Sequence, residues 1–444
     1  MKIHHHKTGW FILIALFFAS CSASDFTPTH IAKIELSPDG KRVAASGHSV
    51  DLSFWSFPEG KEEKSYPDHD HYNPAFIGGE NNFIICKSNR YGTPLKWVGK
   101  VTSINASDKK EIAEISWESS CWESVVSAKN KFMAGSNPEN VLLLKTDAKG
   151  ALRKKELKVS NSQQLALTPD GNWLFSMQGT MGKPKTQKIT KINTASEKIE
   201  SSISYEEMIS GLPKEEDYEY VSPYTSIGPK GNYIALIFKV YGFSSDHILV
   251  VVDLNDKKTI YSSLLGGPSN FETGSIRPSF HFSGNLLAFS RGNKVEVIDL
   301  KTGKTAREYN IISDNSRFIT PSKFMTVTSQ WFIPGTDYLL LPSQKGLFIA
   351  DVSSDEKPIF LPVTPFGIVL SENQKYFALL HGTTAEIRRI PKGELVASLK
   401  HAKDVVTAVF IENGNKIITG GQSLDLITWD IKTGKIEKKW KVNP

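Results

Sequence analysis

Residues 400–440 read KHAKDVVTAVFIENGNKIITGGQSLDLITWDIKTGKIEKKW, and this stretch decides the fold. The apolar run at 405–410 predicts a strand that is buried on both faces. Asn413-Gly414 follows, a dipeptide typical of a two-residue type I′ turn that reverses the chain into a hairpin. The β-branched run at 417–419 predicts the second strand of that hairpin.

The second half of the stretch continues in the same way. Residues 426–429 predict a third strand, which ends at Asp430 and a turn around Gly434. Residues 436–440 alternate between apolar and polar side chains, as a half-buried fourth strand does. The whole stretch is therefore predicted to form a four-stranded antiparallel meander.

The same pattern recurs along the chain from Ile31 onward. A polar turn is followed at once by an apolar second strand, and successive turns are separated by roughly 38 to 60 residues. In several repeats an apolar residue followed by Asp ends the third strand, at 252–253, 298–299, 350–351 and 429–430. The nine turns lie at 37–40, 79–81, 128–130, 168–171, 228–231, 282–285, 334–337, 371–373 and 412–414.

The last repeat resembles the repeat of WD-repeat proteins. The dipeptide Trp429-Asp430 matches the Trp-Asp pair that gives this family its name. Asp425 lies four residues before Trp429, and His401 lies about 28 residues before it. The resemblance implies one hydrogen-bonded chain through His401, Thr419, Asp425 and Trp429 inside the blade. A buried imidazole and a buried indole need such partners. A structural network is therefore expected, and an acid–base pair of His401 and Asp425 is the functional alternative.

The resemblance implies an all-β fold, a single closed β-propeller of four-stranded WD-like blades that spans residues 31–444. Nine repeats are counted, but propellers typically have four to eight blades. Eight or seven blades therefore stay possible, and the repeat at 117–159 is the least regular. No linker and no change of composition interrupts residues 31–442, which favours one domain.

The first 20 residues have the pattern of a signal peptide. Lys2 and Lys7 precede an apolar run at 11–18, and small residues lead to Cys21. The run is too short to span a membrane. The residues before Cys21 resemble the lipobox of bacterial lipoproteins, although Phe18 stands where that family prefers Leu. Cleavage before Cys21 and a lipid on Cys21 are expected.

A plain secreted protein, cut near Ser22-Ala23, is the alternative to lipidation. By resemblance to enteric lipoproteins, Ser22 directly after Cys21 favours the outer membrane, with the protein facing the periplasm or the cell surface. Residues 21–30 would form a short membrane-proximal linker. Its extended length is roughly 30 Å at most, so the folded body is expected to stay close to the membrane.

Charge and cysteine content limit the possible partners. Removal of the signal peptide takes away two Lys and no acids, so the formal charge falls from +6 to about +4. This mild charge gives no argument for nucleic-acid binding. In an oxidising compartment Cys86 and Cys121 could form a disulfide, or they could stay as two separate thiols.

One loop has a metal-like composition: Asp68, His69, Asp70 and His71. Alternating Asp and His can bind zinc or copper where the side chains converge. Successive side chains of an extended loop point apart, so a solvated polar loop is the expected reading and these four are weak metal candidates only.

Long connectors before some repeats suggest a recognition surface. They run over residues 205–220, 266–276 and 311–322 and are expected to crowd one face of a propeller. The first ends in an acidic and aromatic cluster whose members Tyr218, Glu219 and Tyr220 are the predicted partner-binding residues. Tyr provides a large contact area at low entropic cost. Ordinary surface loops are the alternative.

These observations favour a non-catalytic protein-binding scaffold without a cofactor or a small-molecule substrate. The sequence contains no Gly-x-Ser-x-Gly, Walker, dinucleotide, HExxH or EF-hand motif. A quinoprotein-like or lactonase-like enzyme in the central channel is an alternative, but no acidic or His residues recur on the first strands. A metal or carbohydrate binder at the 68–71 loop is the other.

Overall fold

The structure is a computed structural model of the 444-residue chain. Two compact units are distinguished: unit 1 is Met1–Phe76 with Gly367–Pro444, and unit 2 is Ile77–Phe366. The residues that the structure describes are 29–37, 40–48, 50–66, 72–76, 82–91, 96–105, 111–117, 125–127, 132–137, 139–146, 151–180, 183–213, 217–220, 225–241, 247–266, 278–291, 294–310, 331–343 and 345–442.

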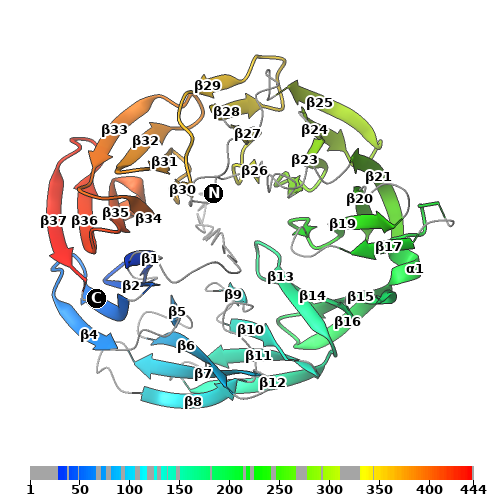
Figure 1. The fold of residues 1–444 in the computed structure, drawn as a ribbon, viewed down its shortest axis with the longest axis horizontal. Helices are drawn as coiled ribbons and strands as arrows, with labels where there is room; N and C mark the ends of the chain where they lie inside the picture. Colours follow the sequence, from blue (N-terminus) through cyan, green and yellow to red (C-terminus); the bar gives the residue numbers. More distant parts are fainter. Residues whose placement is uncertain are drawn as a thin grey trace, which may run out of the picture. The chain divides into compact units, whose positions relative to one another are not determined.

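The first sheet and the last two sheets belong to unit 1. Each is antiparallel, and its four strands lie side by side in chain order (Figure 1). Their strands are β1 (His30–Leu36), β2 (Arg42–His48), β3 (Val50–Ser56) and β4 (Glu62–Tyr66); β30 (Gly367–Leu370), β31 (Tyr376–His381), β32 (Thr384–Arg389) and β33 (Leu395–Lys400); and β34 (Val405–Ile411), β35 (Lys416–Gly421), β36 (Asp425–Asp430) and β37 (Ile436–Lys441).

The next three sheets along the chain follow the same order. The inner strand of the first of them belongs to unit 1, and the strands after it belong to unit 2. They are β5 (Tyr72–Phe76), β6 (Asn82–Tyr91), β7 (Lys96–Asn105) and β8 (Glu111–Trp117); β9 (Val125–Ser127), β10 (Phe132–Ser136), β11 (Asn140–Thr146) and β12 (Leu152–Lys158); and β13 (Ser162–Leu167), β14 (Trp173–Thr180), β15 (Lys183–Asn193) and β16 (Lys198–Ser204).

The remaining three sheets complete unit 2. In the first of them the inner strand has two short parts, and a one-turn helix precedes it. The elements are α1 (Tyr205–Met208), β17 (Asp217–Tyr220), β18 (Ser226–Ile227), β19 (Tyr233–Tyr241), β20 (His247–Asp253) and β21 (Lys258–Gly266); β22 (Ser279–Phe280), β23 (Leu286–Arg291), β24 (Lys294–Asp299) and β25 (Lys304–Asn310); and β26 (Trp331–Phe332), β27 (Tyr338–Ser343), β28 (Gly346–Asp351) and β29 (Ile359–Leu361).

Nine sheets in the described part of the chain match the nine repeats of the sequence. Each apolar second strand of the repeat pairs with the first and third strands of its own sheet. The irregular repeat at 117–159 is also a sheet, but its first strand, β9, has only three residues. The all-β class and the four-stranded repeat are thereby confirmed.

The turn between the first and second strands has a repeated geometry. In the sheet of β13 to β16, the Thr168 amide donates to Trp173 O (3.0 Å), and the Gly171 amide donates to Thr168 O (2.8 Å). The Thr168 hydroxyl accepts from the Trp173 amide (3.1 Å). Ser37 and Ser371 cap their turns in the same way. A hydroxyl at the start of the turn therefore fixes the hairpin locally.

The Asp that ends the third strand caps the next turn. Asp299 Oδ1 accepts from the Lys301 and Thr302 amides, each at 2.9 Å. Equivalent bonds are made by Asp253, Asp351 and Asp430. The repeated apolar-Asp signal in the sequence is therefore a turn cap and not a row of catalytic carboxylates.

One more repeated hydrogen bond joins the end of the third strand to the turn between the first and second strands. The amide just after the capping Asp donates to a turn carbonyl: Leu300 to Asn285 O at 2.8 Å and Ile431 to Asn415 O at 3.1 Å. The third strand is thereby tied to the turn that precedes the second strand.

The turn of the last repeat differs from its prediction. Ile411 pairs with Lys416, so four residues connect the strands where a two-residue type I′ turn was expected. Residues Glu412–Gly414 form a 3₁₀ turn in which Asn413 has φ 53° and ψ 36°. Asn tolerates this left-handed conformation, so the Asn-Gly dipeptide still marks the reversal.

The first and last sheets of unit 1 pack face to face. Their shared core includes Ile31 and Trp55 from the first sheet, and Ile418 and Trp440 from the last. The last sheet contains only its own four strands, β34 to β37, among the described residues. Among the described residues no strand is exchanged between these two sheets, and apolar side-chain packing joins them.

This packing makes a testable prediction about stability. Ile418 is 0% exposed in the shared core, so Ile418→Ala should lower the free energy of unfolding by about 2 to 5 kcal/mol. Ile436, in the same sheet, is 52% exposed, and Ile436→Ala should change it by less than about 0.5 kcal/mol. Urea denaturation measures both, and equal losses would contradict the shared core.

Candidate functional site

Three of the four residues in the predicted network of the last sheet are joined by hydrogen bonds in unit 1. Thr419 lies in β35, Trp429 lies in β36, and His401 directly follows β33. The Trp429 indole N–H donates to Thr419 Oγ1 (2.7 Å), and the same oxygen is 2.8 Å from His401 Nε2. Thr419 Oγ1 also lies 3.3 Å from the carbonyl oxygen of Ile427. The hydroxyl therefore links the indole to the imidazole inside the sheet.

Asp425 departs from the prediction, because in the described residues its carboxylate bonds to neither His401, Thr419 nor Trp429 and acts on His401 only through charge. Its Oδ2 forms an ion pair with Lys439 Nζ at 3.0 Å. Burial lowers the pKa of His401 to about 4; the Asp425 carboxylate opposes this shift, and the Lys439 ammonium adds to it. His401 is therefore neutral at pH 7. It lies among buried bonding partners, as a structural group does.

A second buried histidine fixes a turn in unit 2. His281 lies between β22 and β23, and its Nδ1 is 2.8 Å from Ser283 Oγ. Its Nε2 is 3.1 Å from Thr336 O and 3.1 Å from Asp337 Oδ1 in the turn of the next sheet. Burial lowers the pKa of His281, and Asp337 opposes this shift. The imidazole thereby joins two neighbouring turns.

Phe282 projects from the turn that His281 fixes. Its side chain is 47% exposed, whereas Phe332 beneath the turn is only 5% exposed. The His281 ring lies between them, with centroids 4.2 Å from Phe282 and 5.0 Å from Phe332. A large apolar side chain is thus presented to solvent on a rigid support.

Sequence reasoning missed Phe282. In the aligned turns the same position carries Pro38, Pro169 or Pro229, so an aromatic side chain there was a detectable signal. The repeat pattern predicts the turn itself and says nothing about the exposure of the apolar residue within it.

The structure corrects the prediction for Tyr218. This residue is 1% exposed in the core, and its backbone amide donates to Tyr205 Oη at 3.1 Å. Its own hydroxyl donates to Pro213 O at 3.1 Å. Segment 205–220 contains helix α1 and strand β17 and is therefore no free insertion, because its alternating sequence completes an inner strand. Tyr218 cannot contact a partner; the side chains of Glu219 and Tyr220 lie outside the description.

Other predicted sites also lie outside the described residues. They include Cys21, Cys121, the loop of Asp68, His69, Asp70 and His71, the connector at 266–276 after its first residue, and the connector at 311–322; the side chain of Cys86 is likewise not described. In the described ranges no three His, Cys, Asp or Glu residues gather as a metal site would require. No described helix is long and apolar enough to cross a membrane.

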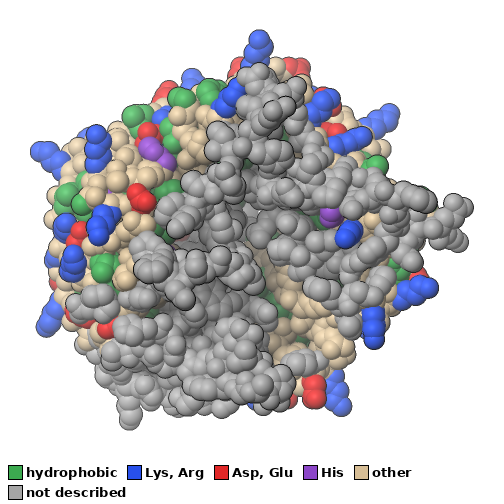
Figure 2. Space-filling view, viewed as in Figure 1, with side chains coloured by type: hydrophobic (Ala, Val, Ile, Leu, Met, Phe, Trp, Pro, Cys, Tyr) green, Lys and Arg blue, Asp and Glu red, His purple; other side chains and the backbone are tan. Residues whose placement is uncertain are grey.

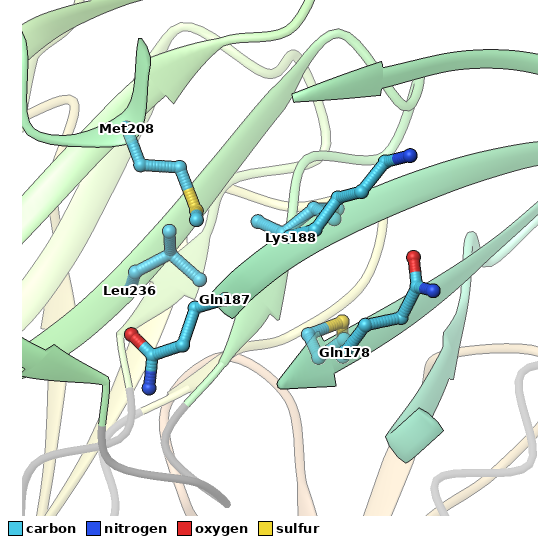
Figure 3. Close-up of a pocket in the computed structure, with 7 residues that line it drawn as sticks. Gln178, Gln187, Lys188, Met208 and Leu236 are labelled. Atoms are coloured by element: carbon cyan, nitrogen blue, oxygen red, sulfur yellow. The ribbon is translucent and has the colours of Figure 1, made fainter. Parts of the chain in front are cut away.

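A small cavity in unit 2 lies between α1, β14, β15 and β19 (Figure 3). Met208 and Leu236 point toward one another there, whereas the ends of Gln178 and Lys188 point away. The cavity volume is about 10 Å³, which is room for one water molecule at most. It is a packing gap, and it cannot hold an organic ligand.

Charge is mixed over the described surface. Figure 2 shows Lys and Arg side chains along the margin of the visible face, with acidic side chains between them. Several pairs are within bonding distance, such as Lys294 with Glu308 at 2.7 Å. On the visible face this alternation fits the weak net charge of the chain.

The buried His401 makes stability depend on pH. Its pKa is about 4 in the folded protein and about 6.5 in an unfolded chain, so below pH 6.5 the unfolded state binds more protons. The free energy of unfolding should therefore be unaffected by the titration of His401 above pH 6.5. As the pH falls to 4, His401 should lower this free energy by about 3 kcal/mol. Urea denaturation of wild type and His401→Gln measures it. A variant with the same pH dependence as wild type would contradict the assignment.

Comparison with known proteins supports the fold. No protein-family model matches the chain, and no curated protein matches its sequence. A structure described as the Dos1 propeller is 10% identical with a TM-score of 0.50, covering 89% of this chain and 91% of that chain. Sqt1 of Chaetomium thermophilum is 14% identical with a TM-score of 0.48, covering 79% and 92%. The chain has the fold of a WD-repeat-like β-propeller, and at these identities the likeness shows the fold alone.

Proposed function

We propose that this chain is a non-catalytic scaffold that binds a protein partner and is anchored in the bacterial cell envelope by a lipid on Cys21. The observation that supports partner binding is the exposure of Phe282 on a turn that buried His281 holds in place.

Phe282 has the properties of an interface anchor. Aromatic side chains supply much of the energy of protein interfaces, because they bury a large apolar area. Its support is already ordered by the bonds of His281 to Ser283 and Thr336, so little entropy is lost on binding. Lys230 is exposed in the neighbouring turn and would belong to the polar rim of such an interface.

The lipid anchor is supported by the sequence around Cys21. Residues 1–20 have the charged, apolar and small-residue segments of a signal peptide, and Cys21 stands at its end. Ser22 favours the outer membrane, by resemblance to enteric lipoproteins. The scaffold would need no cofactor and no small-molecule substrate.

Crosslinking in intact cells tests partner binding. Phe282→Ala should lower the yield of the crosslinked partner at least tenfold at limiting expression, since loss of an aromatic anchor costs about 2 kcal/mol. Leu395→Ala is the matched control, because Leu395 is 54% exposed on an outer strand and should leave the yield unchanged. An equal yield from Phe282→Ala and wild type would remove this turn from the interface.

Mass spectrometry and fractionation test the anchor. Cys21→Ala should release the protein from membranes, because acyl chains on Cys21 would supply the membrane affinity. Wild type should carry a mass increase on the peptide that begins at Cys21. A wild-type peptide without acyl mass, in a protein that still sediments with membranes, would contradict lipidation.

A further inference from the structure

The sheets of unit 1 present three lysines at the edge where their first strands begin, here called the start edge. Lys400 is the last residue of β33 and pairs with Thr384, and Lys441 is the last residue of β37 and pairs with Asp425. Lys403 lies in the connector between β33 and β34. All three are exposed, and the structure gives them no ion pair with a described residue.

The connector that carries Lys403 is tightly held. The Gln422 amide donates to Asp404 O at 3.0 Å, and the Val405 amide donates to Gly382 O at 2.9 Å. A Cβ atom on Gly421 would lie 2.0 Å from Asp404 O, so only glycine permits this approach. The lysines therefore project from a rigid edge.

The folded chain begins at this same edge. His30 is the first residue of β1 and pairs with His48, and Ile31 beside it packs against Gly420 of the last sheet. The segment before His30 therefore leaves unit 1 from the start edge, where Lys400, Lys403 and Lys441 lie. Figure 2 shows Lys and Arg side chains over the region where Figure 1 places β33 to β37.

We infer that the start edge of unit 1 lies against the membrane and that Lys400, Lys403 and Lys441 bind the phosphates of anionic lipid headgroups. The inference rests on the proposed anchor at Cys21. Between Cys21 and His30 the chain can extend roughly 30 Å at most. The edge from which this tether leaves is therefore the edge closest to the headgroups.

Charge complementarity favours lipid phosphate at this edge. Acidic residues at this edge include Asp51, Asp404 and Asp425. Asp51 accepts from Ser65 Oγ at 3.3 Å and Asp425 pairs with Lys439 at 3.0 Å, so these two carboxylates have partners other than the three lysines. An ammonium close to an anionic membrane surface gains about 1 kcal/mol, about fivefold in partition, and the gain is lost as salt screens it. Three lysines together should contribute a factor on the order of 100.

Vesicle sedimentation tests the surface without the acyl chain. The mature chain with Cys21→Ala should bind vesicles that mix phosphatidylglycerol with phosphatidylethanolamine at low salt, and it should not bind phosphatidylcholine vesicles. Adding Lys400→Gln, Lys403→Gln and Lys441→Gln should lower binding on the order of 100-fold.

A second triple variant is the matched control. Lys392, Lys432 and Lys435 are exposed on the same two sheets, at the opposite edge. Their change to Gln removes the same charge and should lower binding less than about threefold. Equal losses from both triples would assign binding to overall charge and overturn the inference, as would undiminished binding by the first triple.

The outcome separates the surface from the anchor. If the wild type is acylated but the start-edge triple variant binds vesicles normally, the lipid anchor is supported and the proposed lysine surface is wrong. If vesicle binding depends on the three lysines but the wild type carries no acyl mass, the lipid anchor is wrong and the lysine surface is supported. If the start-edge triple loses the crosslinked protein partner and binds vesicles normally, the edge serves an acidic protein and the lipid inference is overturned.

Discussion

Sheets of this chain whose side chains are described have two apolar faces, and a neighbouring sheet removes those faces from water. In unit 2 the sheet of β22 to β25 shows both contacts. Phe289 packs with residues of β19 to β21, whereas Val297 packs with residues of β27 and β28. A repeat of this kind is stable only in a stack. This dependence explains why nine repeats with little sequence in common all keep an apolar second strand.

Several buried polar groups inside the sheets are satisfied, and in different ways. In the last sheet one hydroxyl links an indole and an imidazole, whereas Ser176 donates to Ser162 Oγ at 2.8 Å in the sheet of β13 to β16. In the first sheet Ser53 donates to Ser65 Oγ at 3.0 Å. Any paired donor and acceptor avoids the cost of a buried unsatisfied group. The polar WD pattern can therefore be lost from most repeats while the fold persists.

Local sequence predicted the strands well because local physics forms them. Gly and Asx residues set the turns, and apolar β-branched runs between them leave few alternatives. The prediction was wrong where a tertiary contact decides. Tyr218 is buried in a core formed with strands β14, β15, β19 and β20, and Tyr205, thirteen residues earlier, bonds to its backbone. The exposure of Phe282 likewise depends on His281 bonding to a turn of the next sheet, which no single repeat reveals.

The same packing constraint limits where recognition can evolve. A side chain on a sheet face is committed to its neighbour, as Ile418 and Trp440 are in unit 1. Side chains at the edges do not pack against a neighbouring sheet in this way, because the repeated turn bonds are made by the backbone and by the capping Ser, Thr or Asp. Phe282 replaces a turn residue, and Lys403 occupies a connector, without altering those bonds. Substitutions at the edges can therefore change what the protein binds while the buried faces, and hence the fold, stay the same.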